Sequence, residues 1–446
     1  MNTYLRKLWL SFKEMTEIPM SRQKQEGSGS SLYANSFFLM ANSAATNLLG
    51  FLFWVVVARF YAADDLGVGS ALISVGALLS FIATLGLGTG LIRYLSGARS
   101  NASALINSCF TLSSLVALVV AIIFIAGIPL WSPALNLIRG NLLFGGSFVA
   151  FIILGTLFSL LSETYIALRR AEFSLIHGSL MGLLKLILVV SLASLFGVFS
   201  ILAAWTLATA VTIGLGVLLF LTRLQPGYWP MPSLRRQVSN EMVHFSFANY
   251  ISKGLLYAPG WILPVMVVSL LGGQTNAYFF VSWAMAGLLF AIPLEISTSL
   301  FAEGSYQDTH LVRDIKRSFK LILVLILPAT VLLVVAGDKL LLVFGREYSQ
   351  EGARLLWVLA PSVLPLSLNA VYLAIAKVKK RLKDVIIIAV AIAVGTLGLG
   401  YILIPHLGIL GPAVSWIISQ SLVALVVLPR FIKILRSAKA KVSGDY

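Results

Sequence analysis

Long runs of apolar residues, separated by short polar segments, recur along the chain. Each run has roughly 20 residues or more, which at about 1.5 Å per residue is enough for a helix to cross a hydrocarbon core of about 30 Å. The runs are continuously apolar, whereas the strands of a membrane β-barrel alternate and are shorter, so the pattern predicts an all-α membrane protein. We place twelve spans near residues 34–58, 66–92, 104–128, 141–167, 173–196, 200–222, 241–270, 275–300, 318–336, 353–376, 384–404 and 408–430.

The polar segments divide these spans into two lobes of six. A basic stretch interrupted by Pro226, Pro230 and Pro232 separates the sixth span from the seventh. Because each lobe has an even number of spans, we expect both to have the same orientation, related by a pseudo-twofold axis along the membrane normal. The predicted organisation is a basic cytoplasmic segment at 1–30, an N-lobe at 31–225, an interlobe linker at 226–240, a C-lobe at 241–436 and a cytoplasmic tail at 437–446.

A short pattern that occurs in both lobes supports this division. Gly197 is followed eight residues later by Trp205, and Gly408 is followed at the same interval by Trp416, an offset of 211 residues. Such a match indicates a parallel internal repeat. Duplicated membrane lobes usually enclose a substrate path at their interface.

The composition agrees with a membrane protein. Hydrophobic residues make up 59% of the chain and charged residues 11%, which is too few to cover a soluble protein of 446 residues with polar surface. The single cysteine, Cys109, lies within a predicted span, so no disulfide forms within the chain.

The net charge of +16 follows the predicted topology. If the N-terminus is cytoplasmic, most Lys and Arg residues fall on inner segments. The outer loops hold Arg59, Arg139, Lys339, Arg346 and Arg354. This bias is the one that the positive-inside rule produces, so we expect both termini in the cytoplasm and the protein in the cytoplasmic membrane. The basic surplus is then a topology signal, and we expect no nucleic acid as a partner.

The loops carry no sign of catalysis. The outer loops are short, the longest lying around Gly337–Gly352, and leave no room for a catalytic domain. The sequence contains no Walker loop, no His-Glu-x-x-His motif and no zinc-type cysteine spacing. We therefore expect a transporter and not an enzyme, without a cofactor or a metal site. Coupling to an ion gradient or to the membrane potential stays open.

Several stretches resemble a known family. They are Ser31-Leu32-Tyr33-Ala34-Asn35, the run Ala58-Arg59-Phe60-Tyr61-Ala62-Ala63-Asp64-Asp65-Leu66-Gly67 between the first two spans, and Leu85-Gly86-Leu87-Gly88 closing the second. From about residue 31 to residue 436 the chain resembles the polysaccharide-transporter branch, which includes O-antigen flippase-like proteins, of the multidrug/oligosaccharidyl-lipid/polysaccharide (MOP) exporter superfamily. The resemblance implies a flippase that moves polyprenyl-pyrophosphate-linked oligosaccharide across the membrane by alternating access, for polysaccharide or cell-surface glycan biosynthesis. It also implies membrane lipids and glycan assembly enzymes as partners.

Two lysines within the spans are the main candidate site residues. Lys185 and Lys253 each lie about 12 residues from the inner end of a span, about 18 Å deep and close to the bilayer midplane. One lysine from each lobe suits a central cavity that receives an anionic pyrophosphate. The alternative is that each lysine pairs with a carboxylate, for which Glu163 and Glu295 are the candidates.

Four further polar residues complete the candidate set. Arg93 at the inner end of the second span and Arg59 at the outer end of the first could be entry and exit steps for the phosphates, or interfacial anchors. Asn42 in the first span and Asn249 in the seventh could contact sugar or form interhelical hydrogen bonds.

Proline placement differs between the lobes. We expect no proline within the first six spans, whereas prolines interrupt several spans of the C-lobe. Pro259, Gly260 and Pro264 lie just beyond Lys253 and predict a hinge in the seventh span. The alternative is that these prolines fix static kinks.

Two other functions fit the same pattern. A cation-coupled multidrug exporter would be expected to carry an acid within its first spans, and we expect none in the first three here. A non-transporting membrane scaffold for glycosyltransferases could use the basic inner loops equally well.

Overall fold

A computed structural model describes the chain apart from residues 1–27, 99–100, 194–196, 234–239, 307–310 and 443–446. It leaves undescribed the side chains of residues 28–37, 96, 98, 240–249, 306, 311 and 436–442, which lie within helices. The N-terminal segment thus falls almost entirely outside the described residues. All regular structure in the described part of the chain is helical, which confirms the predicted fold class.

The helices fall into two sets. The N-terminal set is α2 (Ser28–Phe60), α3 (Ala63–Ala83), α4 (Leu87–Ala98), α5 (Ala102–Trp131), α6 (Leu137–Gly140), α7 (Leu142–Ala167), α8 (Ala171–Ser191), α9 (Val198–Leu215) and α10 (Thr222–Leu224). The C-terminal set is α11 (Asn240–Leu271), α12 (Gly273–Tyr306), α13 (Leu311–Leu341), α14 (Arg346–Leu359), α15 (Val363–Val378), α16 (Leu382–Leu407) and α17 (Leu410–Val442).

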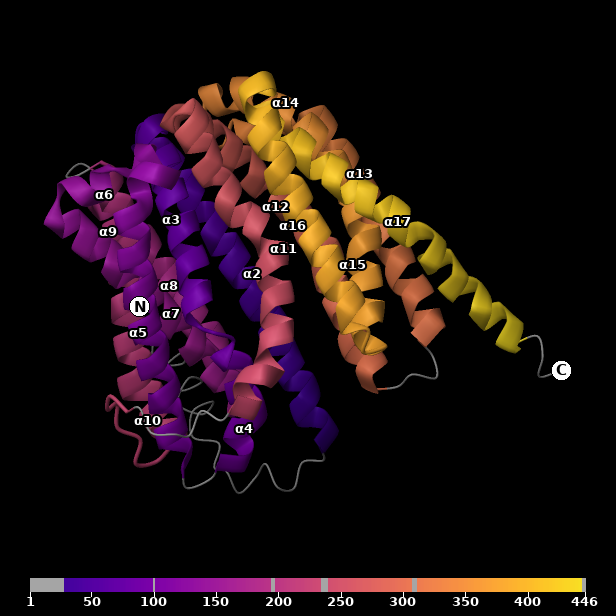
Figure 1. The fold of residues 1–446 in the computed structure, drawn as a ribbon, viewed down its shortest axis with the longest axis horizontal. Coiled ribbons are helices and arrows are strands. Elements are labelled where there is room, and N and C mark those ends of the chain that lie inside the picture. The colour runs from indigo at the N-terminus through magenta and orange to yellow at the C-terminus, as the bar shows by residue number, and fades with distance from the viewer. Residues whose placement is uncertain (1–27, 99–100, 194–196, 234–239, 307–310, 443–446) are drawn as a thin grey trace, which may run out of the picture.

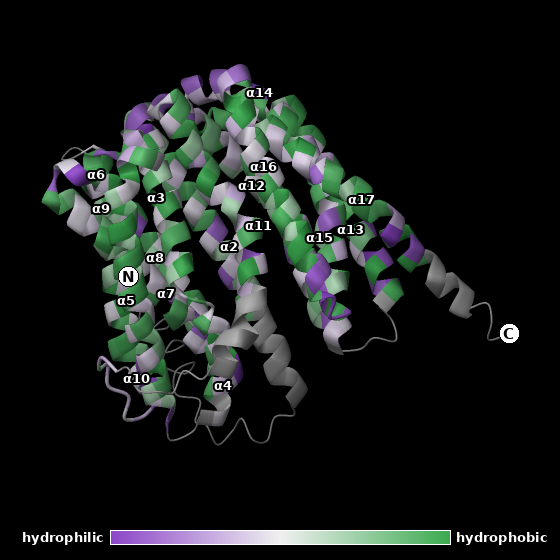
Figure 2. Cartoon of the chain, viewed as in Figure 1, coloured by the Kyte–Doolittle hydropathy of each residue, from purple (hydrophilic) through white to green (hydrophobic). Residues whose placement is uncertain are grey.

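Twelve helical segments within the described residues are long and apolar enough to cross a membrane, as the sequence predicts. Six precede the interlobe linker and six follow it. Figure 2 shows apolar residues along the middle of these helices and polar residues gathered near their ends.

Three predicted details are wrong. The second span is not one helix, because α3 ends at Ala83 and α4 begins at Leu87, with Leu85 and Gly86 at φ 50° and 73° between them. Pro129 lies inside α5, in a lobe where no intramembrane proline was expected. The longest outer loop, expected around Gly337–Gly352, is shorter than expected, because α13 and α14 extend over most of it.

The two lobes share local geometry at the same offset, which confirms the internal repeat. Gly197 before α9 and Gly408 before α17 have φ values of 53° and 57°. Arg169 after α7 and Lys380 after α15 have φ values of 57° and 55°, again 211 residues apart. Left-handed backbone at matched positions shows that each lobe makes the same two turns.

The interlobe linker is anchored to the N-lobe. The Tyr228 hydroxyl donates to Asn107 Oδ1 at 2.8 Å, and Asn107 Nδ2 donates to the carbonyl oxygen of Trp229 at 2.9 Å. Burial raises the pKa of Tyr228 to about 12, so the hydroxyl stays protonated as the donor at neutral pH. The first part of the linker is therefore fixed to α5.

The lobes meet at one end and diverge at the other. In Figure 1 the α13, α15 and α17 helices of the C-lobe slant away from the N-lobe towards the end that carries the predicted cytoplasmic loops. Between the lobes, α11 packs against α3 and α4, and α12 packs against α3. The interface thus depends mainly on the first two helices of the C-lobe.

At the converging end, backbones approach closely. A Cβ on Gly67 of α3 would lie 1.7 Å from the carbonyl oxygen of Gly273 of α12, so this contact requires glycine. Asn276 Nδ2 donates to the carbonyl oxygen of Gly67 at 2.7 Å, and the hydroxyls of Ser132 and Ser269 are 2.9 Å apart. These contacts join the lobes on the predicted outer side.

Candidate functional site

A cavity of about 370 Å³ lies within the N-lobe, with α11 of the C-lobe as one wall. Helices α2, α3, α7, α8 and α9 supply the other walls. Side chains of neighbouring helices pack directly on Gly155 of α7 and on Gly178 and Gly182 of α8. A Cβ on any of these glycines would lie within 2.7 Å of such a side chain, so a larger residue would not fit. The lining is mainly apolar and aromatic, and its charged residues are Lys185 and Lys253.

A second cavity of about 90 Å³ adjoins the first and is more polar. It lies at the break between α3 and α4, beside Glu163 of α7 and Tyr250 of α11. The two cavities share Phe81, Ser159 and Lys253, so Lys253 stands at their boundary. The smaller cavity was not predicted from the sequence. The available signal was the pair of glycines in Leu85-Gly86-Leu87-Gly88, where the second span is interrupted.

Lys185 is held by aromatic rings. Its side chain is 4% exposed, and its ammonium lies 4.0 Å from the ring centre of Trp205 and 5.1 Å from that of Phe53. Such cation–π contacts can contribute about 2 kcal/mol or more when the cation is desolvated. No described carboxylate lies within ion-pair distance of Lys185, so the alternative of a direct salt bridge does not hold for it.

Lys253 is exposed within the cavities and interacts with charges of both signs. Glu163 and Lys377 are close enough for their charges to act on it, yet no described carboxylate lies within the 4.0 Å of a salt bridge to it. Sequence reasoning missed Lys377, assigning it to an inner loop. It belongs to the last turn of α15, and the apolar run that leads directly into it was the available signal.

Glu295 has a different partner from the one considered. Ser43 Oγ of α2 donates to Glu295 Oε1 of α12 at 2.7 Å, a contact between the lobes. Glu295 therefore contributes to lobe packing, and Glu163 is the carboxylate that shares a cavity with Lys253.

The two arginines lie outside both cavities. The Arg59 guanidinium donates to the carbonyl oxygens of Val343 at 2.7 Å and Leu342 at 2.6 Å, which joins α2 to the turn between α13 and α14. Arg93, on α4, lies 5.5 Å from the ring centre of Tyr94. The proposal that these arginines bind phosphate during entry and exit stays a prediction. In this conformation Arg59 forms a contact between the lobes.

The remaining candidates are partly described. Asn42 Oδ1 accepts a hydrogen bond of 3.5 Å from Thr46 Oγ1, which belongs to the same helix and lines the larger cavity. The side chain of Asn249 lies outside the described residues. Pro259, Gly260 and Pro264 lie inside the continuous helix α11, and the hinge there stays a prediction.

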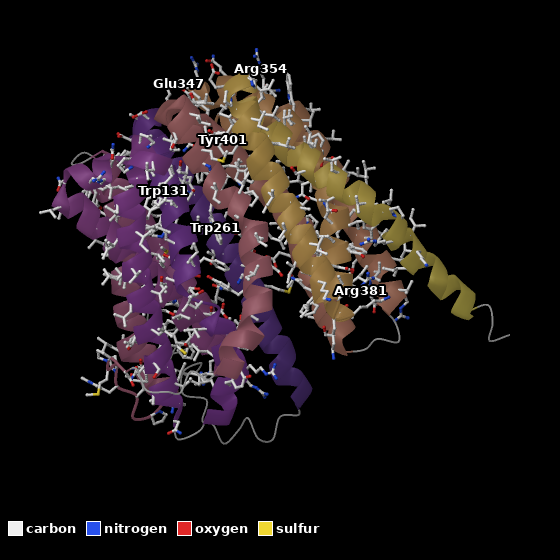
Figure 3. The ribbon with its side chains drawn as sticks, in the orientation of Figure 1. Trp131, Trp261, Glu347, Arg354, Arg381 and Tyr401 are labelled. Carbon is white, nitrogen blue, oxygen red and sulfur yellow. The ribbon has the colours of Figure 1, made fainter. Side chains whose placement is uncertain are left out.

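The site lacks the features of a metal centre. No group of three or more His, Cys, Asp or Glu side chains with metal-binding geometry occurs among the described residues. The arrangement instead presents one ammonium from each lobe to a mainly apolar cavity, beside aromatic side chains. Figure 3 shows Trp261 on α11, in the middle of the molecule.

Comparisons with known proteins agree with this architecture. A family model described as polysaccharide biosynthesis protein matches residues 56–353. The solved structure of the lipid II flippase MurJ in an inward closed conformation has a TM-score of 0.72 at 13% sequence identity, over 89% of this chain and 87% of that chain. A multidrug resistance MATE family transporter of the MOP superfamily, in an inward-facing conformation, has a TM-score of 0.67 at 15% identity, over 89% and 96% of the two chains.

A third solved structure has a title that refers to its binding pocket. It is a MOP superfamily transporter from Pyrococcus furiosus whose "reverse polarity of binding pocket suggests different function", with a TM-score of 0.58 at 16% identity over 92% of this chain and 96% of that chain. A comparison with curated proteins gives no match. The structural likenesses confirm the predicted MOP-exporter fold.

Proposed function

Because the chain belongs to the polysaccharide biosynthesis protein family, we propose that it is a flippase for polyprenyl-pyrophosphate-linked oligosaccharide in the cytoplasmic membrane. The observation that carries this proposal is the pair Lys185 and Lys253, one from each lobe, on the wall of one cavity without a directly paired carboxylate among the described residues. A lysine near the bilayer centre costs on the order of 3 kcal/mol on insertion scales, and such a cost is normally tolerated for function.

A diphosphate fits this arrangement chemically. Lys253 is exposed to the cavity and offers up to three N–H donors, and charge-assisted hydrogen bonds to phosphate are about twice as strong as neutral ones. The nearby charge of Lys377 adds to the attraction for an anion. Lys185, held by Trp205 and Phe53, contributes a fixed positive charge at the N-lobe wall.

The shape supports alternating access. The lobes are joined by Arg59, Asn276 and the Ser132–Ser269 pair at the predicted outer end and diverge at the other. We infer that a state closed at the predicted outer end is the one that loads cargo from the cytoplasmic side. Breaking the outer contacts while closing the inner side would present the same lysines outward.

The rival is a cation-coupled multidrug exporter of the same fold. Glu163, in the smaller cavity, is the acid that favours it. The larger cavity favours an anion, because its charged lining residues are the two lysines. A non-transporting scaffold for glycosyltransferases would need neither lysine.

A transport assay separates these functions. The protein is reconstituted in vesicles with a fluorescent polyprenyl-pyrophosphate oligosaccharide, and the fraction of glycan reaching the opposite leaflet is measured by glycosidase accessibility. We expect Lys253→Ala to lower the rate at least tenfold, Lys253→Arg to keep part of it, and Lys339→Ala, an exposed change at the outer end of α13, to have no effect.

Three outcomes would contradict the proposal or the role of Lys253 in it. If the protein exports cationic dyes and does not flip the lipid-linked glycan, it is the multidrug exporter. If it shows neither activity, the scaffold function is the one that fits. If Lys253 serves only to neutralise Glu163, the double variant Lys253→Ala/Glu163→Ala should recover the rate that either single change loses.

A further inference from the structure

One face of α11 carries a stripe of aromatic side chains around Lys253. Tyr250, Lys253, Tyr257 and Trp261 follow one another at intervals of three, four and four residues, which places them on one side of a helix. Tyr250 lines the smaller cavity, Tyr257 and Trp261 line the larger one, and Lys253 lines both. The stripe therefore runs along the wall where the proposed phosphate ligand lies.

The rings of this stripe form a connected surface with Phe81 of α3. Tyr250 stacks on Phe81 with ring centres 4.5 Å apart and an interplanar angle of 11°. The ring centre of Trp261 lies 5.2 Å from that of Phe81, and the ring centre of Tyr257 lies 5.7 Å from that of Trp261 with an interplanar angle of 23°. Tyr250 is fixed further, since its hydroxyl donates to the carbonyl oxygens of Phe81 and Ile82, both at 2.9 Å.

Two members of the stripe have unused surface. Tyr257 is 53% exposed and Trp261 is half-buried, and both line the larger cavity. Neither the Tyr257 hydroxyl nor the Trp261 indole N–H forms a hydrogen bond with any described residue. The other large rings of the cavity are occupied, as with Trp205 against Lys185 and Phe158 stacked at 4.3 Å on His177. Tyr257 and Trp261 thus contact each other, but part of their ring surface and both of their polar groups have no partner among the described residues.

A sugar ring has the matching chemistry. One face of a pyranose presents C–H groups, which pack against an aromatic ring, while its hydroxyls need hydrogen-bond partners at the rim, which a phenol and an indole N–H supply. A polyprenyl chain would use the ring faces but neither polar group. Small-molecule sites usually have this composition, a mainly apolar and aromatic lining with a few polar groups that fix the orientation of the ligand.

The spacing from Lys253 agrees with a sugar. At about 1.5 Å per residue, Tyr257 lies about 6 Å and Trp261 about 12 Å from Lys253 along the helix. In a lipid-linked oligosaccharide the first sugar is bonded directly to the second phosphate. A diphosphate at Lys253 would therefore place that sugar within one or two helical turns.

We propose that Tyr257 and Trp261 form a subsite for the sugar ring attached to the pyrophosphate at Lys253. This subsite rests on the proposed function. It makes the aromatic stripe responsible for distinguishing glycan-bearing lipid from bare polyprenyl pyrophosphate, while Lys253 recognises the charge that both share.

Binding of two probes tests the subsite. The full-length protein in nanodiscs is titrated with undecaprenyl pyrophosphate and with the same lipid carrying one N-acetylhexosamine, and both Kd values are measured. We expect the wild type to bind the glycosylated probe more tightly. Trp261→Leu should weaken that probe about five- to tenfold and leave the bare lipid unchanged, Trp261→Phe should restore part of the affinity, and Tyr257→Phe should have a smaller effect by removing one hydroxyl.

Matched controls come from the outer surface of the C-lobe. Trp357 and Tyr401 are 58% and 68% exposed and line neither cavity, so Trp357→Leu and Tyr401→Phe should leave both Kd values unchanged. A Trp261→Leu variant that loses both probes equally, or neither, would overturn the subsite while leaving the flippase intact. If the wild type binds neither probe, the proposed function fails and the subsite with it; thermal unfolding of each variant excludes misfolding as the cause.

Discussion

At the scale of single residues, the two lysines illustrate how environment separates similar side chains. The sequence places Lys185 and Lys253 at similar depth and treats them alike. In the structure Lys185 is buried against two rings, whereas Lys253 is exposed at the boundary of two cavities with Glu163 across the smaller one. Depth follows from counting along a helix, but the partner of a side chain depends on helix rotation and on neighbouring helices. The sequence alone predicts neither the rotation of a helix nor which helices lie beside it.

Lys185→Met tests whether the buried lysine is kept for function. Methionine has a similar length and keeps the packing against Trp205 and Phe53, while it removes a charge whose desolvation is unfavourable. We expect the unfolding temperature to stay unchanged or to rise, and the flipping rate to fall severalfold. Thermal unfolding in detergent and the vesicle assay measure the two effects. A marked loss of thermal stability would show that the cation–π contacts are structural.

At the scale of helices, the sequence predicted the spans and missed their interruptions. Twelve spans and the two-lobe division follow from hydropathy and from the repeat at Gly197 and Gly408, because burial in lipid imposes length and composition on every helix. The break at Leu85 and Gly86 escaped because its residues are as apolar as those around them. Residues that interrupt a helix without changing its hydropathy leave a weak signal, and here that break shapes the smaller cavity.

The repeated turns give a prediction for two helix ends. Arg169 and Lys380 have left-handed backbone, and each is followed by a residue whose N–H returns to the preceding helix, Arg170 to Tyr165 and Arg381 to Ala376. A non-glycine residue in this conformation destabilises the folded state by about 1–2 kcal/mol. Glycine removes this strain, but it also raises the entropy of the unfolded chain, so only part of the energy is gained as stability.

Arg169→Gly and Lys380→Gly should therefore each stabilise the folded protein by about 0.5–1 kcal/mol, and the β-branched changes Arg169→Val and Lys380→Val should destabilise it. Both positions are exposed, so packing changes little. Unfolding in detergent measures the effect, with Lys379→Gly as a control outside the left-handed region. Stabilisation in one lobe alone would contradict the equivalence of the two turns.

At the scale of the whole molecule, three of the contacts between the lobes lie at the predicted outer end. Arg59 joins α2 to the turn after α13, Asn276 joins α12 to the backbone of α3, and Ser132 meets Ser269 of α11. Each contact links the two lobes, and together they form a closure on the predicted outer side. A transporter that alternates between two states must break them in every cycle.

The Ser132–Ser269 contact allows this closure to be locked. The two hydroxyls are 2.9 Å apart, so a Ser132→Cys/Ser269→Cys variant places two thiols within reach of a disulfide, and the native Cys109 is buried and does not compete. We expect oxidation to lower the flipping rate in proportion to the cross-linked fraction, and reduction to restore it. Arg59→Ala should slow cross-linking by weakening the closed state. The single-cysteine variants, treated with the same oxidant, are the controls. Unchanged flipping in a fully cross-linked sample would show that the outer contacts do not open during transport, and alternating access about this interface would be wrong.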